Sequence, residues 1–215
     1  MKKVKYPVIL FDLDGTLIDS MPDMLACMNE AYAKEGIFEA KPAREHIGPP
    51  LLECLKQITP RLEDSILERV ADNFKSRYDT FNYPNTFIYP GVKETLKYLK
   101  NGKIKLYLVT NKRYVPALRI LKILGLEYFE EVISPDINKG KRMNKTEMLA
   151  CLVKKAKINP KNAVYVGDSA SDITSARANG LKTAAVTYGY NTKEQLEETE
   201  PDYVLDSFEE LKKLI

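Results

Sequence analysis

Short apolar runs recur along the chain, separated by loops or by segments with helical spacing. The first run is Pro7–Leu10, and five more follow later in the chain. Short apolar runs bounded by polar residues are typical of strands that are buried on both faces. Such strands alternating with helices predict an α/β fold, a doubly wound parallel sheet with helices on both sides. The later strands are expected at Leu106–Val109, Glu131–Ser134, Ala163–Val166, Thr183–Val186 and Tyr203–Leu205.

Helical spacing fills most of the gaps between these strands. Met148, Leu149, Leu152 and Val153 share one helical face with Ala156. Glycine is favoured just after the last turn of a helix, and it follows two of the expected helices. The expected core helices are Gly91–Leu99, Val115–Leu124, a segment around Met148–Ala156, Asp172–Asn179 and Phe208–Ile215.

Residues 17–90 differ from the rest because they contain no convincing strand pattern. The first helix there is expected between Ser20 and Gly36, which are a typical start residue and a typical stop residue. Two more helices are expected at Leu51–Gln57 and Leu62–Tyr78. The pattern predicts an all-helical domain inserted into the α/β core, with the insert at residues 19–85 and the core at residues 1–18 and 86–215.

Composition and charge narrow the class of protein. The chain has 215 residues and a net charge of +3, and its lysines are scattered, so no nucleic-acid or membrane partner is expected. The lysine-rich start precedes an apolar run of about five residues, short of the roughly 7–15 of a signal peptide. Three widely spaced cysteines show no metal-ligand spacing. A cytoplasmic protein is expected, and both a monomer and a homodimer remain open.

Candidate chemistry begins where the first predicted strand ends. Asp12 and Asp14 lie one residue apart, so their side chains point the same way if the strand continues. Two carboxylates at one strand end repel each other and favour a hard cation. Gly15 lets the chain turn, and the hydroxyl of Thr16 follows. The alternative is a simple Asp-Gly turn, but a turn requires neither Asp12 nor Thr16.

Polar residues also follow two other predicted strands. Thr110, Asn111 and Lys112 come after one strand, and the segment Gly167–Asp172 follows another. Lys145 begins the amphipathic helix that precedes the second of these strands. The carboxyl ends of parallel strands meet at one edge of a sheet, where ligands bind. Asp12, Thr110 and Asp168 each occupy such an end, so we expect these three side chains to converge.

On these residues, nearly the whole chain resembles the haloacid dehalogenase superfamily. It is most similar to the group of phosphoglycolate phosphatases and β-phosphoglucomutases, in which a helical cap follows the first strand. The nucleophile motif of the family matches Asp12-Leu13-Asp14-Gly15-Thr16, and its second-motif hydroxyl matches Thr110. Its acidic motif matches Gly167–Asp172. Its lysine matches Lys145, with Lys141 as the competing assignment.

The resemblance implies a catalytic and metal-binding role for three aspartates. Asp12 would attack phosphorus and form an aspartyl phosphate. Asp14 would protonate the leaving alcohol and then deprotonate the attacking water. Mg²⁺ would be held by Asp12, the main-chain carbonyl of Asp14, and Asp168. The second aspartate, Asp14, favours phosphate esters over halides and phosphonates within the superfamily.

The resemblance also implies a phosphate-binding set. Lys145 and the Thr110 hydroxyl would bind the transferring phosphoryl oxygens, and the backbone N–H groups of Gly15 and Asn111 would add donors. Asp172 would orient Lys145 or metal-bound waters, and its alternative role is that of a helix N-cap.

Two residues of the insert are candidate substrate contacts. Arg44 and His46 lie in the loop 43–50, which contains a glycine and two prolines. Relatives use similar loops of the cap to contact substrate. The alternatives are a surface charge for Arg44 and a structural or exposed role for His46, the only histidine.

The sequence therefore predicts a Mg²⁺-dependent hydrolase for a small phosphorylated metabolite, with phosphoglycolate as the first substrate to consider. Hydrolysis of pyrophosphate, a nucleotide or a sugar phosphate, and a phosphosugar mutase, remain alternatives. A non-catalytic binding module on the same scaffold is the alternative from another class.

Overall fold

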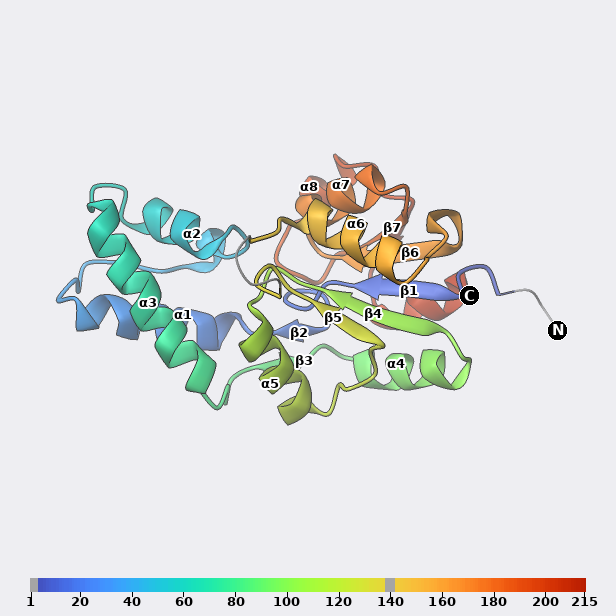
Figure 1. Cartoon of the computed structure of the whole chain (residues 1–215), viewed down its shortest axis with the longest axis horizontal. Helices are drawn as coiled ribbons and strands as arrows, with labels where there is room; N and C mark the ends of the chain where they lie inside the picture. Colours follow the sequence, from blue (N-terminus) through green and yellow to red (C-terminus); the bar gives the residue numbers. More distant parts are fainter. Residues whose placement is uncertain (1–3, 138–141) are drawn as a thin grey trace. The chain divides into compact units, whose positions relative to one another are not determined.

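The computed structural model describes residues 4–137 and 142–215, and the chain divides into two compact units (Figure 1). Unit 1 comprises residues 1–19 and 87–215, and unit 2 comprises residues 20–86.

The centre of unit 1 is a six-stranded sheet with the order β5-β4-β1-β6-β7-β8, and every neighbouring pair is parallel. The chain winds outward in both directions from β1, so the strand order reverses there. Ligands bind at such a switch point, beyond the carboxyl ends of the strands. The predicted doubly wound parallel sheet is confirmed. The strands are β1 Val8–Phe11, β4 Lys105–Val109, β5 Glu131–Ile133, β6 Ala163–Gly167, β7 Lys182–Val186 and β8 Tyr203–Leu205.

Helices cover both faces of this sheet. In Figure 1, α6 and α7 lie on one face and α4 and α5 on the other, as right-handed crossovers require. Leu10, Tyr107 and Tyr165 come from three adjacent strands and pack with Met148 and Leu152 of α6 in one buried cluster. The helices are α4 Val92–Asn101, α5 Tyr114–Leu124, α6 Lys145–Lys155, α7 Ala170–Ala178 and α8 Lys193–Glu197, with 3₁₀ helices η2 Pro160–Asn162 and η3 Phe208–Leu214.

Two details of unit 1 differ from the sequence expectation. The expectation of no strand within residues 17–90 is wrong at both ends of that stretch, because β2 (Ile18–Asp19) pairs antiparallel with β3 (Phe87–Ile88). Two-residue strands are too short to show an alternating pattern. The expected terminal helix is the 3₁₀ helix η3, in which Phe208 and Leu211 are buried. A spacing of three residues matches the three residues per turn of a 3₁₀ helix.

Unit 2 is helical. Helix α1 (Met21–Lys34) packs against α3 (Asp64–Thr80), and α2 (Leu51–Ile58) packs against α3 and the short 3₁₀ helix η1 (Arg44–His46). Across the described part of the chain, no helix has both the length and the apolar character needed to cross a membrane.

One carboxylate of unit 2 is fully buried. Asp23 on α1 has no exposed surface. It accepts hydrogen bonds from the Asn85 backbone N–H and side-chain amide and from the Thr86 hydroxyl, the last at 2.7 Å. These neutral donors fix the end of unit 2 to the start of α1.

Candidate active site

The first candidate residues leave β1 in a tight loop. The Asp12 N–H donates to the Val166 carbonyl at 2.9 Å, so the pairing of β1 with β6 extends to Asp12. Gly15 has a φ of 80°, and a Cβ at this position would overlap the carboxylate of Asp168. Glycine is therefore required at this turn, where the loop after β1 meets Asp168.

Lys145 is the central cation of the site. Its Nζ lies 2.6 Å from Asp12 Oδ1 and 2.9 Å from Asp172 Oδ1, and it also contacts the Tyr165 hydroxyl at 3.1 Å. The N-cap of α6 is Asn144, whose side chain accepts from the Glu147 N–H, so Lys145 is the first residue of that helix. The capping box thus places the ammonium group at the carboxyl edge of the sheet.

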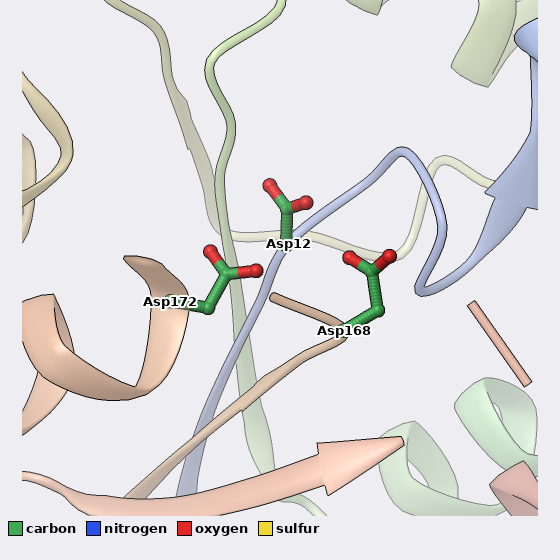
Figure 2. A group of neighbouring side chains, drawn as sticks. All are labelled: Asp12, Asp168 and Asp172. Carbon is green, nitrogen blue, oxygen red and sulfur yellow. The ribbon is translucent and has the colours of Figure 1, made fainter. Parts of the chain in front are cut away.

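Three buried carboxylates surround a common space. Oxygen atoms of Asp12, Asp168 and Asp172 lie within 4.8 Å of one another. Figure 2 shows them arriving from the loop after β1, the loop after β6 and the first turn of α7. With one ammonium among them, this cluster carries an excess of negative charge.

Burial and the neighbouring charges shift the pKa of Asp12, Asp168 and Lys145. Burial raises the pKa of Asp12 to about 7, although the charge of Lys145 opposes the change. Burial also raises the pKa of Asp168 well above its usual range, and the charges of Asp172 and Asp12 add to this. For Lys145, burial alone would lower the pKa, but Asp12 and Asp172 raise it well above the ordinary value. Burial and repulsion between like charges therefore make an additional cation favourable here.

A divalent cation fits the donor chemistry of this cluster. Carboxylate oxygens are the ligands preferred by hard cations such as Mg²⁺, and added positive charge would relieve the repulsion. Asp168 is held in place by the Tyr190 N–H, which donates to its Oδ2 at 2.7 Å, and by the Thr16 hydroxyl at 3.4 Å. These neutral donors orient the Asp168 carboxylate without cancelling its charge.

Asp172 is already occupied by protein donors. Its Oδ1 accepts from Lys145 and from the Tyr165 hydroxyl, and its Oδ2 accepts from the N–H and hydroxyl of Ser169. The N-cap of α7 is Ser169, so Asp172 is the third residue of a capping box and not the N-cap itself. Its contacts suit a residue that orients Lys145.

Thr110 lies directly after β4 and is 1% exposed. Its Oγ1 accepts a hydrogen bond from the Lys112 N–H at 3.1 Å. Because the backbone donor uses a lone pair of the oxygen, the hydroxyl proton stays available for another acceptor.

A second buried lysine lies beside the other aspartate of the loop after β1. Lys112 Nζ is 3.0 Å from Asp14 Oδ1, and the two side chains are 4% and 18% exposed. The site therefore contains two buried lysines: Lys145, which contacts Asp12 and Asp172, and Lys112, which contacts Asp14.

The contacts described above do not include the other predicted residues. Asn111 is exposed. Arg44 is exposed and His46 half-buried in η1 of unit 2, where His46 Nδ1 accepts from the Ala43 N–H at 3.1 Å. Their contacts with substrate stay predictions. The alternative lysine, Lys141, lies outside the described residues.

Sequence reasoning gave no role to three residues that contact the site. Tyr165 is fully buried in β6, and its hydroxyl touches Lys145 and Asp172. Tyr190 supplies the N–H that holds Asp168. A tyrosine inside an apolar strand carries no signal in the sequence. The position of Lys112, in contrast, is a signal in the sequence, because this residue lies two positions after Thr110, the candidate hydroxyl at the end of a predicted strand.

Comparison with known proteins places the chain in a family. A family model described as haloacid dehalogenase-like hydrolase matches residues 9–186. A phosphoglycolate phosphatase of Vibrio vulnificus is 34% identical over 98% of this chain and 96% of its own length. Phosphoglycolate phosphatase 1 of Pseudomonas aeruginosa is 34% identical over 95% of this chain and 78% of its own length.

A crystal structure of a similar protein has the same fold as this chain. The crystal structure of a predicted phosphoglycolate phosphatase from Haemophilus somnus superposes with a TM-score of 0.85 and 27% identity, covering 98% of both chains. The chain therefore belongs to the haloacid dehalogenase-like hydrolase family, as the resemblance of its motifs predicted, and it is a phosphatase of that family.

Proposed function

We propose that the chain is a Mg²⁺-dependent phosphatase that cleaves a small phosphomonoester through an aspartyl-phosphate intermediate on Asp12. The observation that carries the proposal is the contact of Lys145 with both Asp12 and Asp172 inside the three-carboxylate cluster. A nucleophilic carboxylate beside a fixed ammonium and further acidic groups suits phosphoryl transfer, which depends mainly on positioning and charge stabilisation.

Charge balance supports the requirement for a metal ion. The site described above contains four carboxylates but two ammonium groups, so a phosphate dianion would meet an excess of negative charge. The side chains of Asp12 and Asp168 would hold Mg²⁺, together with the main-chain carbonyl of Asp14. When bound, the ion would offset negative charge on the phosphoryl oxygens and on the nucleophile.

In the first half of the reaction, an oxygen of Asp12 attacks phosphorus and the bond from phosphorus to the ester oxygen breaks. Asp14 gives its proton to that oxygen, so the alcohol leaves neutral. Lys145 and the Thr110 hydroxyl donate hydrogen bonds to the phosphoryl oxygens during the transfer.

In the second half, a water molecule attacks the phosphorus of the aspartyl phosphate, and Asp14 takes its proton. The bond from phosphorus to the Asp12 oxygen breaks, which releases inorganic phosphate and regenerates the carboxylate. Asp172 orients Lys145 in both halves and is not itself consumed.

Phosphoglycolate is the first substrate to test because two relatives with that activity in their names are 34% identical over nearly all of this chain. Phosphoglycolate is a phosphate monoester of a small alcohol, and transfer of its phosphoryl group matches the roles given to Asp12 and Asp14. We infer that Arg44 and His46 of unit 2 help to bind the rest of the substrate.

The experiment measures phosphate release from a panel of phosphate esters with Mg²⁺ and with EDTA. The panel includes phosphoglycolate, sugar phosphates, nucleotides and pyrophosphate. Wild type should release phosphate with Mg²⁺ and not with EDTA. Peptide mass spectrometry of acid-quenched protein should find phosphate on Asp12. Asp12→Asn should neither release phosphate nor become phosphorylated. The control is Asp202→Asn, which changes a carboxylate paired with Lys182 away from the site and should behave like wild type. Equal phosphate release by wild type and Asp12→Asn would refute the role of the nucleophile.

A further inference from the structure

Lys112 is a buried cation that the proposed reaction does not use. Its side chain is 4% exposed, and its Nζ lies 3.0 Å from Asp14 Oδ1. Removing a lysine ammonium from water costs free energy unless a partner of opposite charge compensates. Asp14 supplies that compensation, and Asp14 is the residue that must exchange a proton with the leaving alcohol and with water.

Lys112 is joined to the site at two points. Its ammonium contacts Asp14, and its backbone N–H donates to Thr110 Oγ1 at 3.1 Å. The lysine therefore connects the end of β4, which carries a phosphate-binding hydroxyl, to the loop after β1. Lys145 cannot replace it, because its described partners are Asp12, Asp172, Tyr165 and Val109.

A free aspartate side chain at a loop populates several rotamers, and general acid catalysis needs one of them. A charged contact with a buried partner restricts this freedom more strongly than a contact with an exposed partner, because the surroundings screen it less. Asp14 is itself only 18% exposed, so its contact with Lys112 is largely shielded from water.

We propose that Lys112 is a positioning residue that holds the Asp14 carboxylate in place for proton transfer to the leaving group. The inference rests on the proposed function, in which Asp14 is the general acid. Lys112 acts through Asp14 and not through the phosphoryl group, so its importance grows with the need of the leaving oxygen for a proton.

The test compares kcat/KM for two esters, because this parameter reports the step in which the ester bond breaks. An alkyl phosphate such as phosphoglycolate has a poor leaving group that needs a proton, whereas p-nitrophenolate leaves without one. Lys112→Met should lower kcat/KM for the alkyl ester by about 10²-fold, the lower end of the range for general acid catalysis, and for p-nitrophenyl phosphate by less than about threefold. Lys112→Arg, which keeps the charge, should recover most of the loss.

The link to Asp14 is tested with a double-mutant cycle. Asp14→Asn should also affect the alkyl ester far more than the aryl ester, and adding Lys112→Met to Asp14→Asn should cause little further loss. Lys155→Met, which removes an exposed lysine paired with Glu131, is the matched control and should leave both esters at the wild-type rate. Lys112→Gln serves as a second variant if Lys112→Met does not fold.

The possible failures are distinguishable. Equal losses on both esters in Lys112→Met, or losses that add to those of Asp14→Asn, would overturn the role of Lys112 while leaving the phosphatase proposal intact. A wild type without Mg²⁺-dependent turnover, or an Asp14→Asn variant that loses both esters equally, would contradict the proposed function itself.

Discussion

Two groups of buried carboxylates in this molecule have opposite surroundings. Asp23 in unit 2 is fully buried and accepts hydrogen bonds from neutral donors of Asn85 and Thr86. Asp12 and Asp168 in unit 1 are buried beside further carboxylates, and burial raises the pKa of both. In the first arrangement, hydrogen-bond donors surround one carboxylate. In the second, several carboxylates lie close to one another in a buried space.

The comparison shows that burial alone does not identify a functional carboxylate. A buried acid surrounded by matched donors is what folding by itself favours. Like charges crowded into a buried space cost stability, so they indicate a site that gains something else, such as a metal ion or a reaction. Substitutions in either arrangement should therefore have different effects on stability and activity.

The largest effect is expected for Asp12→Asn. Loss of the proposed nucleophile should reduce turnover roughly 10⁴-fold or more, as removal of a catalytic nucleophile does in other hydrolases. Its melting temperature should be no lower than that of wild type, because one of three crowded negative charges is gone and Lys145 keeps Asp172. Steady-state kinetics and thermal unfolding of the same preparation measure both quantities. A large loss of stability would show that Asp12 is a structural carboxylate like Asp23.

The response of stability to Mg²⁺ should depend on Asp168. A ligand at about 100 times its Kd stabilises the folded protein by about 2.7 kcal/mol. Wild type should show a stabilisation of this order in urea unfolding with Mg²⁺, and Asp168→Asn should show little at the same concentration. The control is Asp72→Asn, which changes an exposed carboxylate of α3. An unchanged response in Asp168→Asn would remove this residue from the metal site.

Asp23→Ala should reduce the free energy of unfolding without involving the chemistry of the site. The substitution leaves the buried Thr86 hydroxyl and the donors of the exposed Asn85 without their acceptor, and a buried unsatisfied group costs about 1–3 kcal/mol. The expected loss is about 3 kcal/mol in urea unfolding, on the same scale. No loss of stability would mean that the buried carboxylate is not a structural one.

The smallest effect is expected for Arg69→Met. Arg69 is paired with Glu35 at 2.8 Å, but its side chain is 58% exposed. Exposed ion pairs contribute little because water and salt screen them, so the loss should be no more than about a quarter of that for Asp23→Ala. Urea midpoints of the two variants give the ratio. Comparable losses would show that exposed pairs hold unit 2 together.

The strands were predictable because a strand that is buried on both faces consists of a short run of apolar residues. Ala163–Val166 was expected and β6 is Ala163–Gly167. The clustering of Asp12, Asp168 and Asp172 followed from the rule that parallel strands end at one edge. Helix α8 was missed, although its capping box of Thr192 and Gln195 is visible in the sequence.

The partners of other side chains had no local signal in the sequence, even where the residue itself, such as Lys112, follows a strand end. Asp14 and Lys112 are distant in the chain, and only the register of β1 against β4 brings their loops together. The hydroxyl of Tyr165 reaches Lys145 because strand alternation points it toward α6, but a tyrosine in an apolar run also fits a purely hydrophobic core. The sequence therefore did not predict which side chains of distant segments contact one another.

The central position of β1 in the sheet has a consequence for the synthesis of the protein on the ribosome. The strand that carries Asp12 is synthesised before the other strands of its sheet, yet it lies between β4 and β6. A nascent chain that has emerged only as far as α5 holds Asp12, the proposed nucleophile, without Lys145, Asp168 or Asp172. Catalytic competence must therefore arrive late in translation, and an incomplete chain of that length should be unable to attack phosphorylated metabolites.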